Sequence, residues 1–444
     1  MNIFENKIFK VEDEHLYFDG RDLTKLSEVY GSPLYIFSER ELRKNVNEVI
    51  VAFRTAYAKT SIHYAAQCES TLANLQVIRD AGCNLQVNSG GELFKGLQAG
   101  FEGRQIIFTG ACKTATELEL AIRSCVKAIN VDSIYELTRI AEIAQELDMP
   151  VNIALMVAPD SSYYGQDSRG ENIPESEFGI TFEQLRTAIR MSQKNKQHIR
   201  LRGYHLQLQK GLDKPEDARG AFAAMLETAV KMYQLTGFIP RTLNLGGGMS
   251  PEDLEEIACK VAEELSMEKV KTWAGDPLQD FFQGVELIIE PGKKIAASAG
   301  ILLTSVVNEK YRKNLNENWL VLDEGFEGMG SGRPQKKRLE HGQLLCANKI
   351  TEKHGMPYRI SGLAAETSGG AWLPNSMTAG DLVAFMDAGA YNNSCLPSFN
   401  GRPRPGVVMI KKNDTVKEIK RPQRYEDLLE GEEPFREPLN LCVI

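Results

Sequence analysis

The sequence predicts a (β/α)8 barrel of TIM type, joined to a C-terminal β-rich, Greek-key-like domain that also takes in the N-terminus. Short runs rich in β-branched and aromatic residues alternate with longer segments whose apolar residues have helical spacing, as expected for parallel strands connected by helices. The strand-like runs are residues 61–66, 84–89, 105–110, 128–133, 151–157, 201–207, 242–248 and 285–292. This number of runs favours a closed barrel, and a doubly wound open sheet is the alternative.

A second domain follows the barrel, because the helical alternation stops after about residue 296. From there the runs ILLTSVVNEK, NWLVLDEG and GVVMIKKND predict strands separated by Gly, Asn and Asp turns. The opening residues, with LYFDG and PLYIF, have the same character and are expected to pair with this domain. The expected domains are a barrel at residues 38–295 and a β-rich domain made of residues 1–37 and 296–444. The polar segment 160–177 predicts a long loop after the fifth barrel strand.

Composition restricts the class of partner. The 444 residues have a formal net charge of -8 without a long run of like charges, so we expect neither a nucleic-acid nor a membrane partner. No stretch of 18 apolar residues is present to span a bilayer. The 8 cysteines form no CxxC pair and no secretory signal opens the sequence, which indicates a cytoplasmic location. The 6 isolated histidines give no support for a metal site.

Several residues with chemical potential are predicted at the C-terminal ends of the barrel strands, where ligands of such barrels bind. The turn LNLGGGMS places Gly246, Gly247 and Gly248 at a helix start, where backbone N–H groups can approach a phosphate. A tight turn without a ligand is the alternative. Glu290 in IIEPGKK is either a paired structural residue or the electronic partner of a cofactor. His205, at another strand end, is equally consistent with a core histidine.

The combination of motifs is more specific than each motif alone. In chain order the motifs are SGGEL, NVDS, EFGI, His205, GGG, EPG, GDLVAFMDAGAY and FNGRPRP. This order closely resembles the diaminopimelate and ornithine decarboxylase family, which are pyridoxal-phosphate (PLP) enzymes of fold type III with an alanine-racemase-like barrel. The resemblance covers nearly the whole chain, and DAGAY, FNGRPRP and KRPQRYEDLL are similar to the diaminopimelate branch in particular.

The resemblance implies a PLP site. It assigns the cofactor phosphate to the three glycines 246–248 together with Gly292 and Tyr391. It also implies that Glu290 pairs with the pyridinium nitrogen and that His205 stacks on the ring face.

The resemblance further implies an amino-acid-like substrate and a homodimer. Arg333, in GRPQ, is similar to the arginine that clamps a substrate carboxylate in the diaminopimelate branch. Glu366, in AAETSG, is similar to the glutamate that receives a distal amino group across the dimer interface. The expected enzyme class, if the protein is catalytic, is a carbon–carbon lyase.

Gln67 is the main departure from the family pattern. The family's first barrel strand ends in YAxKAN, whose lysine forms a Schiff base with PLP, whereas this chain has YAAQCE. A carboxamide cannot form an imine, because its nitrogen lone pair is delocalised into the carbonyl group. Any PLP would therefore be held without a covalent bond.

Other departures fall at positions that the resemblance assigns to the cofactor or to catalysis. They are Met156, Ala158, Glu177, Gln207, Leu208 and Ala365. Because these further positions also differ, a single engineered change at position 67 does not explain the pattern. The motifs that build the scaffold are nevertheless present. Lys210 and Lys293 are possible substitute amines, with a solvated surface lysine as the alternative reading of each.

Two hypotheses follow from these departures. The first is a diverged PLP-dependent decarboxylase that acts on a charged amino acid or its conjugate. The second is a pseudoenzyme that binds a metabolite, or that regulates an active homologue by forming a dimer with it.

Overall fold

The computed structural model describes residues 8–158, 178–206, 215–248, 253–265, 282, 284–324, 344–362, 366–396 and 398–435. The chain divides into two compact units. The barrel unit consists of Glu39–Ala299 and Gly389–Ser394, and the β unit consists of Met1–Ser38, Gly300–Ala388 and Cys395–Ile444. The predicted loop at residues 160–177 lies outside the described residues.

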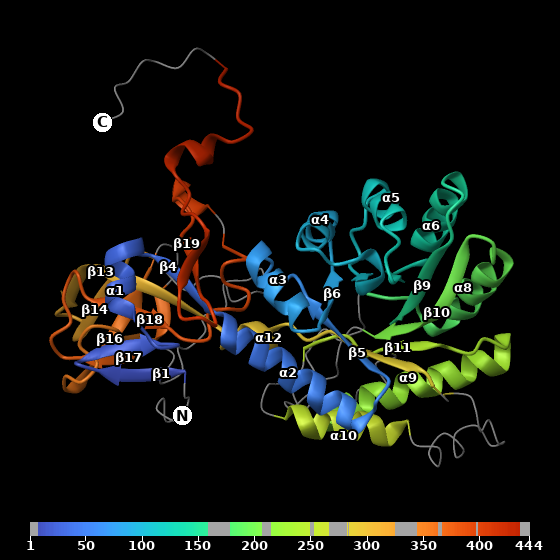
Figure 1. The fold of residues 1–444 in the computed structure, drawn as a ribbon, viewed down its shortest axis with the longest axis horizontal. Coiled ribbons are helices and arrows are strands. Elements are labelled where there is room, and N and C mark those ends of the chain that lie inside the picture. Colours follow the sequence, from blue (N-terminus) through green and yellow to red (C-terminus); the bar gives the residue numbers. More distant parts are fainter. Residues whose placement is uncertain are drawn as a thin grey trace. The chain divides into compact units, whose positions relative to one another are not determined.

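In the described part of the barrel unit, eight parallel strands close into a barrel (Figure 1). The strands are β5 (Thr60–Ala65), β6 (Asn84–Val87), β7 (Ile106–Phe108), β8 (Ala128–Val131), β9 (Val151–Val157), β10 (Ile199–Leu206), β11 (Thr242–Asn244) and β12 (Glu286–Ile289). The last strand pairs with the first through Leu287 and Thr60, which closes the ring. The predicted (β/α)8 barrel is therefore confirmed, and the open-sheet alternative is wrong.

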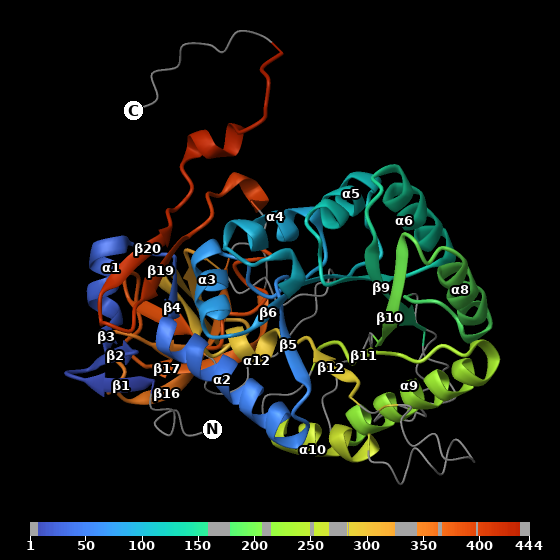
Figure 2. The ribbon, with the colours of Figure 1, turned by 45° about the vertical axis from the view of Figure 1, so that its right-hand side comes forward.

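Helices surround the barrel strands, as Figure 2 shows. They are α2 (Glu39–Ala56), α3 (Leu72–Asp80), α4 (Gly90–Gln98), α5 (Ala115–Arg123), α6 (Ile134–Glu146), α8 (Phe182–Lys194), α9 (Pro215–Thr236), α10 (Leu254–Glu264) and α12 (Lys293–Ala296). Three of these helices, α4, α5 and α6, have a hydroxyl residue as N-cap: Ser89, Thr114 and Ser133. Each hydroxyl accepts a hydrogen bond from the amide N–H three residues later. Among the described residues, no helix has the length and apolar character needed to cross a membrane.

The β unit is built on a mixed sheet that includes a strand from the N-terminal segment. Its strands are β4 (Leu34–Ser38), β13 (Gly300–Arg312), β14 (Glu317–Leu322), β15 (Leu344–Cys346), β16 (His354–Ser361), β17 (Glu366–Pro374), β18 (Leu382–Phe385), β19 (Gly406–Ile410) and β20 (Val416–Lys420). Strand β4 pairs antiparallel with β13 and parallel with β19. The expectation that the N-terminus joins the C-terminal β-rich domain is confirmed.

Smaller elements complete the β unit, and its core lies on both faces of the mixed sheet. A small antiparallel sheet and one helix precede β4: β1 (Phe9–Glu12), β2 (His15–Phe18), β3 (Arg21–Asp22) and α1 (Leu23–Tyr30). Short 3-10 helices are Gly103–Gln105 in the barrel unit, and Phe399–Gly401 and Tyr425–Leu429 in the β unit. Tyr35 and Phe37 belong to one hydrophobic cluster, whereas Leu34 and Ile36 belong to another. Successive side chains of a strand point to opposite faces, so β4 is buried on both sides.

Candidate cofactor site

Two consecutive glycines shortly after β11 form a backbone cradle in the barrel unit. Gly246 has a φ of +72°, and a Cβ there would lie 2.5 Å from the carbonyl oxygen of Leu206. A Cβ at Gly247 would lie 2.2 Å from the carbonyl oxygen of Glu290. Contacts this short with backbone atoms cannot be relieved by a side-chain rotation. The loop therefore requires glycine because the ends of β10, β11 and β12 approach one another closely.

Glu290 and Asn244 connect this loop to a buried carboxylate. The side-chain amide of Asn244 donates a hydrogen bond of 2.7 Å to Glu290 Oε1, and the N–H of Gly246 donates one of 2.9 Å to Asn244 Oδ1. The N–H of Glu290 also donates to the carbonyl oxygen of Gly246 at 2.7 Å. These bonds fix the carboxylate relative to the loop. They also use the N–H of Gly246 within the protein, so this N–H is not available to a ligand.

His205 lies beside this carboxylate at the end of β10. Its side chain is fully buried, and its Nε2 lies 3.5 Å from Glu290 Oε2, which is too long for a good hydrogen bond. Neither ring nitrogen forms a hydrogen bond with a described residue. Buried polar groups are normally hydrogen-bonded, so an imidazole in this state is suited to contact a bound group. Met156, which was named from the sequence, pairs with His205 across β9 and β10 and so lies next to the site.

Gln67 and Tyr391 lie together at the end of β5. The Gln67 side chain is exposed, and its Nε2 lies 3.5 Å from the Tyr391 hydroxyl. Tyr391 has a φ of +60°, and its N–H donates a 2.8 Å hydrogen bond to the carbonyl oxygen of Cys68. A Cβ at Gly292 would lie 3.1 Å from the Cβ of Cys68, so the turn after β12 also packs here. The segment that carries Tyr391 belongs to the barrel unit.

The other predicted site residues are distributed differently. Glu366 is the first residue of β17, in the β unit. Lys293 is exposed and is the first residue of α12, directly after Gly292. Six residues named from the sequence lie outside the described residues: Glu177, Gln207, Leu208, Lys210, Arg333 and Ala365.

Sequence analysis missed Asn244, which links Glu290 to the glycine loop. A signal was present, because Asn244 stands two residues before Gly246 and an Asn side chain readily accepts a hydrogen bond from the backbone two residues on. Glu69 and Asn393 were not predicted either; they are far apart in the chain and form a hydrogen bond with one another. Their partnership has no local sequence signal.

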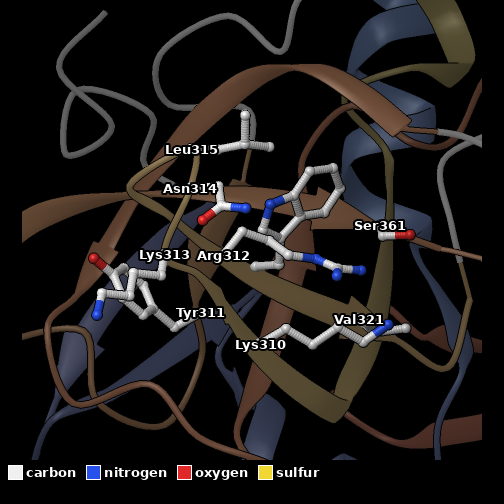
Figure 3. A pocket seen from close by; sticks show the side chains of 9 residues that line it. Lys310, Tyr311, Arg312, Lys313, Asn314, Leu315, Val321 and Ser361 are labelled. Atoms are coloured by element: carbon white, nitrogen blue, oxygen red, sulfur yellow. The ribbon is translucent and has the colours of Figure 1, made fainter.

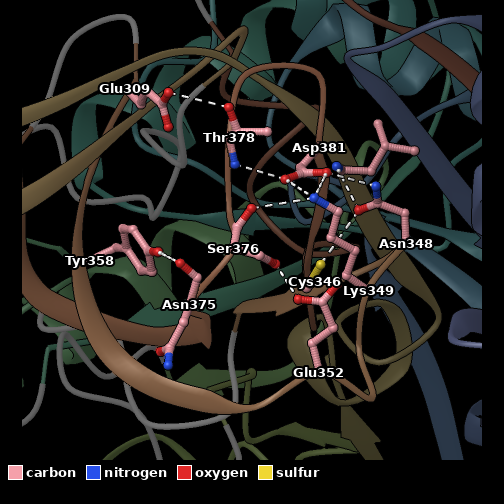
Figure 4. Close-up of polar contacts among 11 residues, drawn as sticks. Glu309, Cys346, Asn348, Lys349, Glu352, Tyr358, Asn375, Ser376, Thr378 and Asp381 are labelled. Atoms are coloured by element: carbon pink, nitrogen blue, oxygen red, sulfur yellow. Dashed lines mark hydrogen bonds and ion pairs between the residues drawn. The ribbon is translucent and has the colours of Figure 1, made fainter.

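The motif GDLVAFMDAGAY begins with a structural anchor in the β unit, shown in Figure 4. Asp381 accepts hydrogen bonds from Lys349 Nζ at 2.9 Å, Asn348 Nδ2 at 2.9 Å and the N–H of Thr378 at 2.8 Å. Asp381 is buried, so these donors offset the cost of removing its charge from water. The aspartate therefore fixes the start of β18 and is not part of the candidate site.

A cavity of about 840 Å³ lies on the β unit (Figure 3). It is lined by Lys310, Tyr311, Arg312, Lys313, Asn314, Leu315, Trp319, Val321 and Ser361. The lining combines cationic and aromatic side chains and includes none of the residues predicted for the cofactor site. The cavity on the β unit and the candidate cofactor site therefore share no residue.

Comparison with known proteins identifies the class that this fold and site define. The pyridoxal-binding domain of the pyridoxal-dependent decarboxylases matches residues 43–297 of this chain. The chain therefore belongs to the pyridoxal-dependent decarboxylase family, whose cofactor is PLP. The resemblance identified from the sequence motifs is confirmed.

Several diaminopimelate decarboxylases are similar to this chain. The protein of Bacillus subtilis strain 168 is 29% identical over 433 residues, which cover 95% of this chain and 96% of that protein. The protein of Methanocaldococcus jannaschii is 28% identical, with 96% of each chain covered. The crystal structure of M. jannaschii diaminopimelate decarboxylase in co-complex with L-lysine has a TM-score of 0.84 and 26% identity, covering 97% of this chain and 98% of that one.

The residues of the barrel unit fit PLP. The glycine loop is a cradle in which a Cβ would strike backbone atoms, so it can bring N–H groups close to a phosphate. The buried Glu290 offers a carboxylate oxygen that Asn244 does not use, and the buried His205 has no hydrogen-bond partner among the described residues. These are groups that a phosphorylated, protonated pyridine can contact.

Proposed function

We propose that this chain binds PLP in the glycine cradle without a covalent bond and acts as a diverged amino-acid decarboxylase. The observation that carries the proposal is the arrangement of Glu290, Asn244 and the glycine loop, which is intact although Gln67 stands at the position of the family's lysine. Burying a carboxylate and an imidazole side by side is costly without enough hydrogen-bond partners, and a bound PLP that contacts both groups would offset this cost.

Each residue of the cradle has a defined task in this proposal. The N–H groups of Gly247 and Gly248 and the Tyr391 hydroxyl would hold the phosphate, and Glu290 Oε2 would accept a hydrogen bond from the pyridinium N–H. His205 covers the ring face. When bound, PLP supplies a sink for the electrons left on the substrate when carbon dioxide departs. A carboxylate that keeps the pyridine nitrogen protonated strengthens that sink.

Gln67 changes how substrate and cofactor are handled. Its carboxamide cannot form a covalent bond to the cofactor, but its Nε2, which lies 3.5 Å from the Tyr391 hydroxyl, can donate a hydrogen bond. The cofactor is then retained by noncovalent contacts alone and exchanges with solution. The amine of the substrate must react without help from a lysine at position 67, so turnover is slow.

The proposed substrate is an amino acid with a charged distal group, or a conjugate of one. The similar M. jannaschii enzyme was solved with L-lysine, which carries a distal amino group. In the proposal Arg333 binds a substrate carboxylate, and Glu366 receives the distal amino group across the interface of a cytoplasmic homodimer. These assignments rest on the motifs in which both residues occur.

A non-catalytic role is the second candidate, and one observation favours it. Met156 lies next to His205, so the departures from the family pattern reach the ring face as well as the lysine position. A protein of this kind would bind PLP or an amino-acid conjugate, or would pair with an active homologue, without turnover.

Titration of the purified protein with PLP, followed by incubation with a panel of amino acids, tests the proposal. Cofactor fluorescence measures PLP binding, and mass spectrometry measures carbon dioxide release. We expect reversible binding that Glu290→Gln weakens, with slow release of carbon dioxide from a substrate that carries a distal charge. Binding without turnover on any substrate would support the non-catalytic role. No PLP binding at all would refute the proposed decarboxylase, and of the non-catalytic role only binding of an amino-acid conjugate or pairing with an active homologue would stand.

A further inference from the structure

Two turns of the barrel unit that are distant in sequence are joined by a set of hydrogen bonds. One turn, Gln67–Thr71, follows β5, and the other is the segment Gly389–Ser394. The carbonyl oxygen of Cys68 accepts from the N–H of Tyr391 at 2.8 Å and from the Ser394 hydroxyl at 3.0 Å. These bonds set the backbone of one turn against the other.

A buried carboxylate forms the second part of this connection. Glu69 is 1% exposed, and its Oε1 accepts a 2.6 Å hydrogen bond from the N–H of Thr71. Its Oε2 accepts a 3.0 Å bond from Asn393 Nδ2, which also lies 3.1 Å from the Thr71 hydroxyl. Both donors to the Glu69 carboxylate are neutral. A carboxylate buried with neutral partners needs every hydrogen bond, so its geometry is strictly fixed.

The connection lies close in sequence to Gln67 and Tyr391, whose side chains contact each other in the candidate site. Gln67 stands two residues before Glu69, and Tyr391 stands two residues before Asn393. Tyr391 has a left-handed backbone conformation, which a residue with a Cβ adopts only when its surroundings hold it. The hydrogen bonds of Glu69 and Asn393 therefore hold the pair of turns that keeps Gln67 Nε2 beside the Tyr391 hydroxyl.

We infer that Glu69 and Asn393 are positioning residues for the PLP site. Neither is assigned a contact with the cofactor; they act by fixing the turn of Gln67 against the segment of Tyr391. The positioning itself follows from the hydrogen bonds, whereas its consequence for PLP affinity rests on the proposed function. The two parts are tested by separate measurements on the full chain.

The test uses Asn393→Asp and its rescue by Glu69→Gln. Asn393→Asp places two carboxylates where one donor and one acceptor now lie 3.0 Å apart, so they repel each other. In the double variant, the oxygen of the carboxamide introduced at position 69 accepts from the N–H of Thr71. The nitrogen of that carboxamide donates to the carboxylate introduced at position 393, so the bond reforms with reversed polarity. Glu69→Gln alone is the control, because Asn393 can turn its own carboxamide to accept from the introduced amide.

Amide hydrogen exchange in the cofactor-free protein measures positioning. We expect Asn393→Asp to speed exchange of the Tyr391 amide at least tenfold, as the loss of about 1.4 kcal/mol of stabilisation implies, and the double variant to restore it. Unchanged exchange in Asn393→Asp, or a double variant as disturbed as the single one, would overturn the inference. If Asn393→Asp alone fails to fold, recovery of the folded protein by the double variant supports the pairing, and failure of both refutes it.

PLP titration measures the consequence for the site. We expect Asn393→Asp to weaken PLP binding about tenfold in the wild-type background and to have no effect in the Tyr391→Phe background, because its action passes through Tyr391. Faster exchange with unchanged PLP affinity would overturn the role at the site while the proposed function stands. If the wild-type protein bound no PLP, the proposed function would fail and the exchange measurement alone would judge the positioning.

Discussion

Gly247 is the residue with the least room for change in the candidate site, because a Cβ would lie 2.2 Å from the carbonyl oxygen of Glu290. We predict that Gly247→Ala lowers the free energy of unfolding by about 1–3 kcal/mol, the usual cost of overpacking, and abolishes PLP binding because the loop must move. Denaturant unfolding and PLP titration measure the two effects.

Gly91→Ala is the matched control for this substitution. Gly91 lies in α4, and a Cβ there would meet no atom closer than 3.8 Å. Alanine has the higher helix propensity by about 1 kcal/mol, so this variant should be as stable as the wild type or more stable, with unchanged PLP affinity. PLP affinity that survived Gly247→Ala would show that the glycine loop does not hold the phosphate.

We predict that His63 in β5 makes the protein less stable in acid. Burial, and then the positive charge of Lys127, lower the pKa of His63 from 6.5 to about 3. Between these values the unfolded chain binds a proton that the folded protein does not, so stability falls as the pH falls through this range. The slope from this residue is at most about 1.4 kcal/mol per pH unit.

The variant His63→Asn tests this dependence, since an asparagine amide can still donate to the carbonyl oxygen of Leu85 without titrating. We expect the stability of the wild type, relative to the variant, to decrease as the pH is lowered from 6.5. A difference that stayed constant over this range would mean that His63 is protonated in the folded protein as readily as in the unfolded one.

At the scale of elements, a buried ion pair joins the loop after β7 to α6. Lys113 Nζ lies 2.6 Å from Glu136 Oε1, and the Lys113 side chain is fully buried. Burial raises the pKa of Glu136, and Lys113 opposes this rise. We predict that Lys113→Met lowers the free energy of unfolding by about 3–5 kcal/mol, because Glu136 loses its partner.

Two further variants separate this pair from an ordinary surface contact. Lys113→Met with Glu136→Gln should recover most of the stability, because the amide oxygen can still accept from the N–H of Asp132. Arg139→Met, which removes an exposed ion pair with Glu142, should change stability by less than about 1 kcal/mol. Thermal unfolding of the three proteins compares them, and equal losses for Lys113 and Arg139 would contradict the buried-pair account.

The sequence predicted the strands of the barrel far better than the contacts between them. Residues 151–157 were expected as a strand and form β9 with the same bounds, because a short and mainly apolar run between polar segments is typical of a buried strand. The glycine loop and Glu290 could likewise be placed at strand ends. The Glu69–Asn393 bond could not, because it joins residues 324 positions apart and depends on how two turns meet.

At the scale of the whole molecule, we predict a homodimer. The segment GLAAETSGGAWLP is rich in small and apolar residues, and Trp372 on β17 is 48% exposed. Large aromatic side chains at a surface are enriched in interfaces between proteins. Sedimentation at micromolar protein concentration should show a dimer, and Trp372→Glu should shift it toward the monomer. A wild-type protein that sedimented only as a monomer would contradict this prediction.

Borohydride treatment tests most directly whether PLP is bound without a covalent link, as we propose from Gln67. Borohydride fixes PLP permanently to any lysine that has condensed with it, and mass spectrometry of peptides then locates that lysine. We predict no modified lysine in the wild-type protein at a PLP concentration that saturates binding, and a modification at position 67 in Gln67→Lys. A stoichiometric modification of a wild-type lysine, such as Lys293 or Lys210, would contradict the account and would identify the residue that replaces the family's lysine.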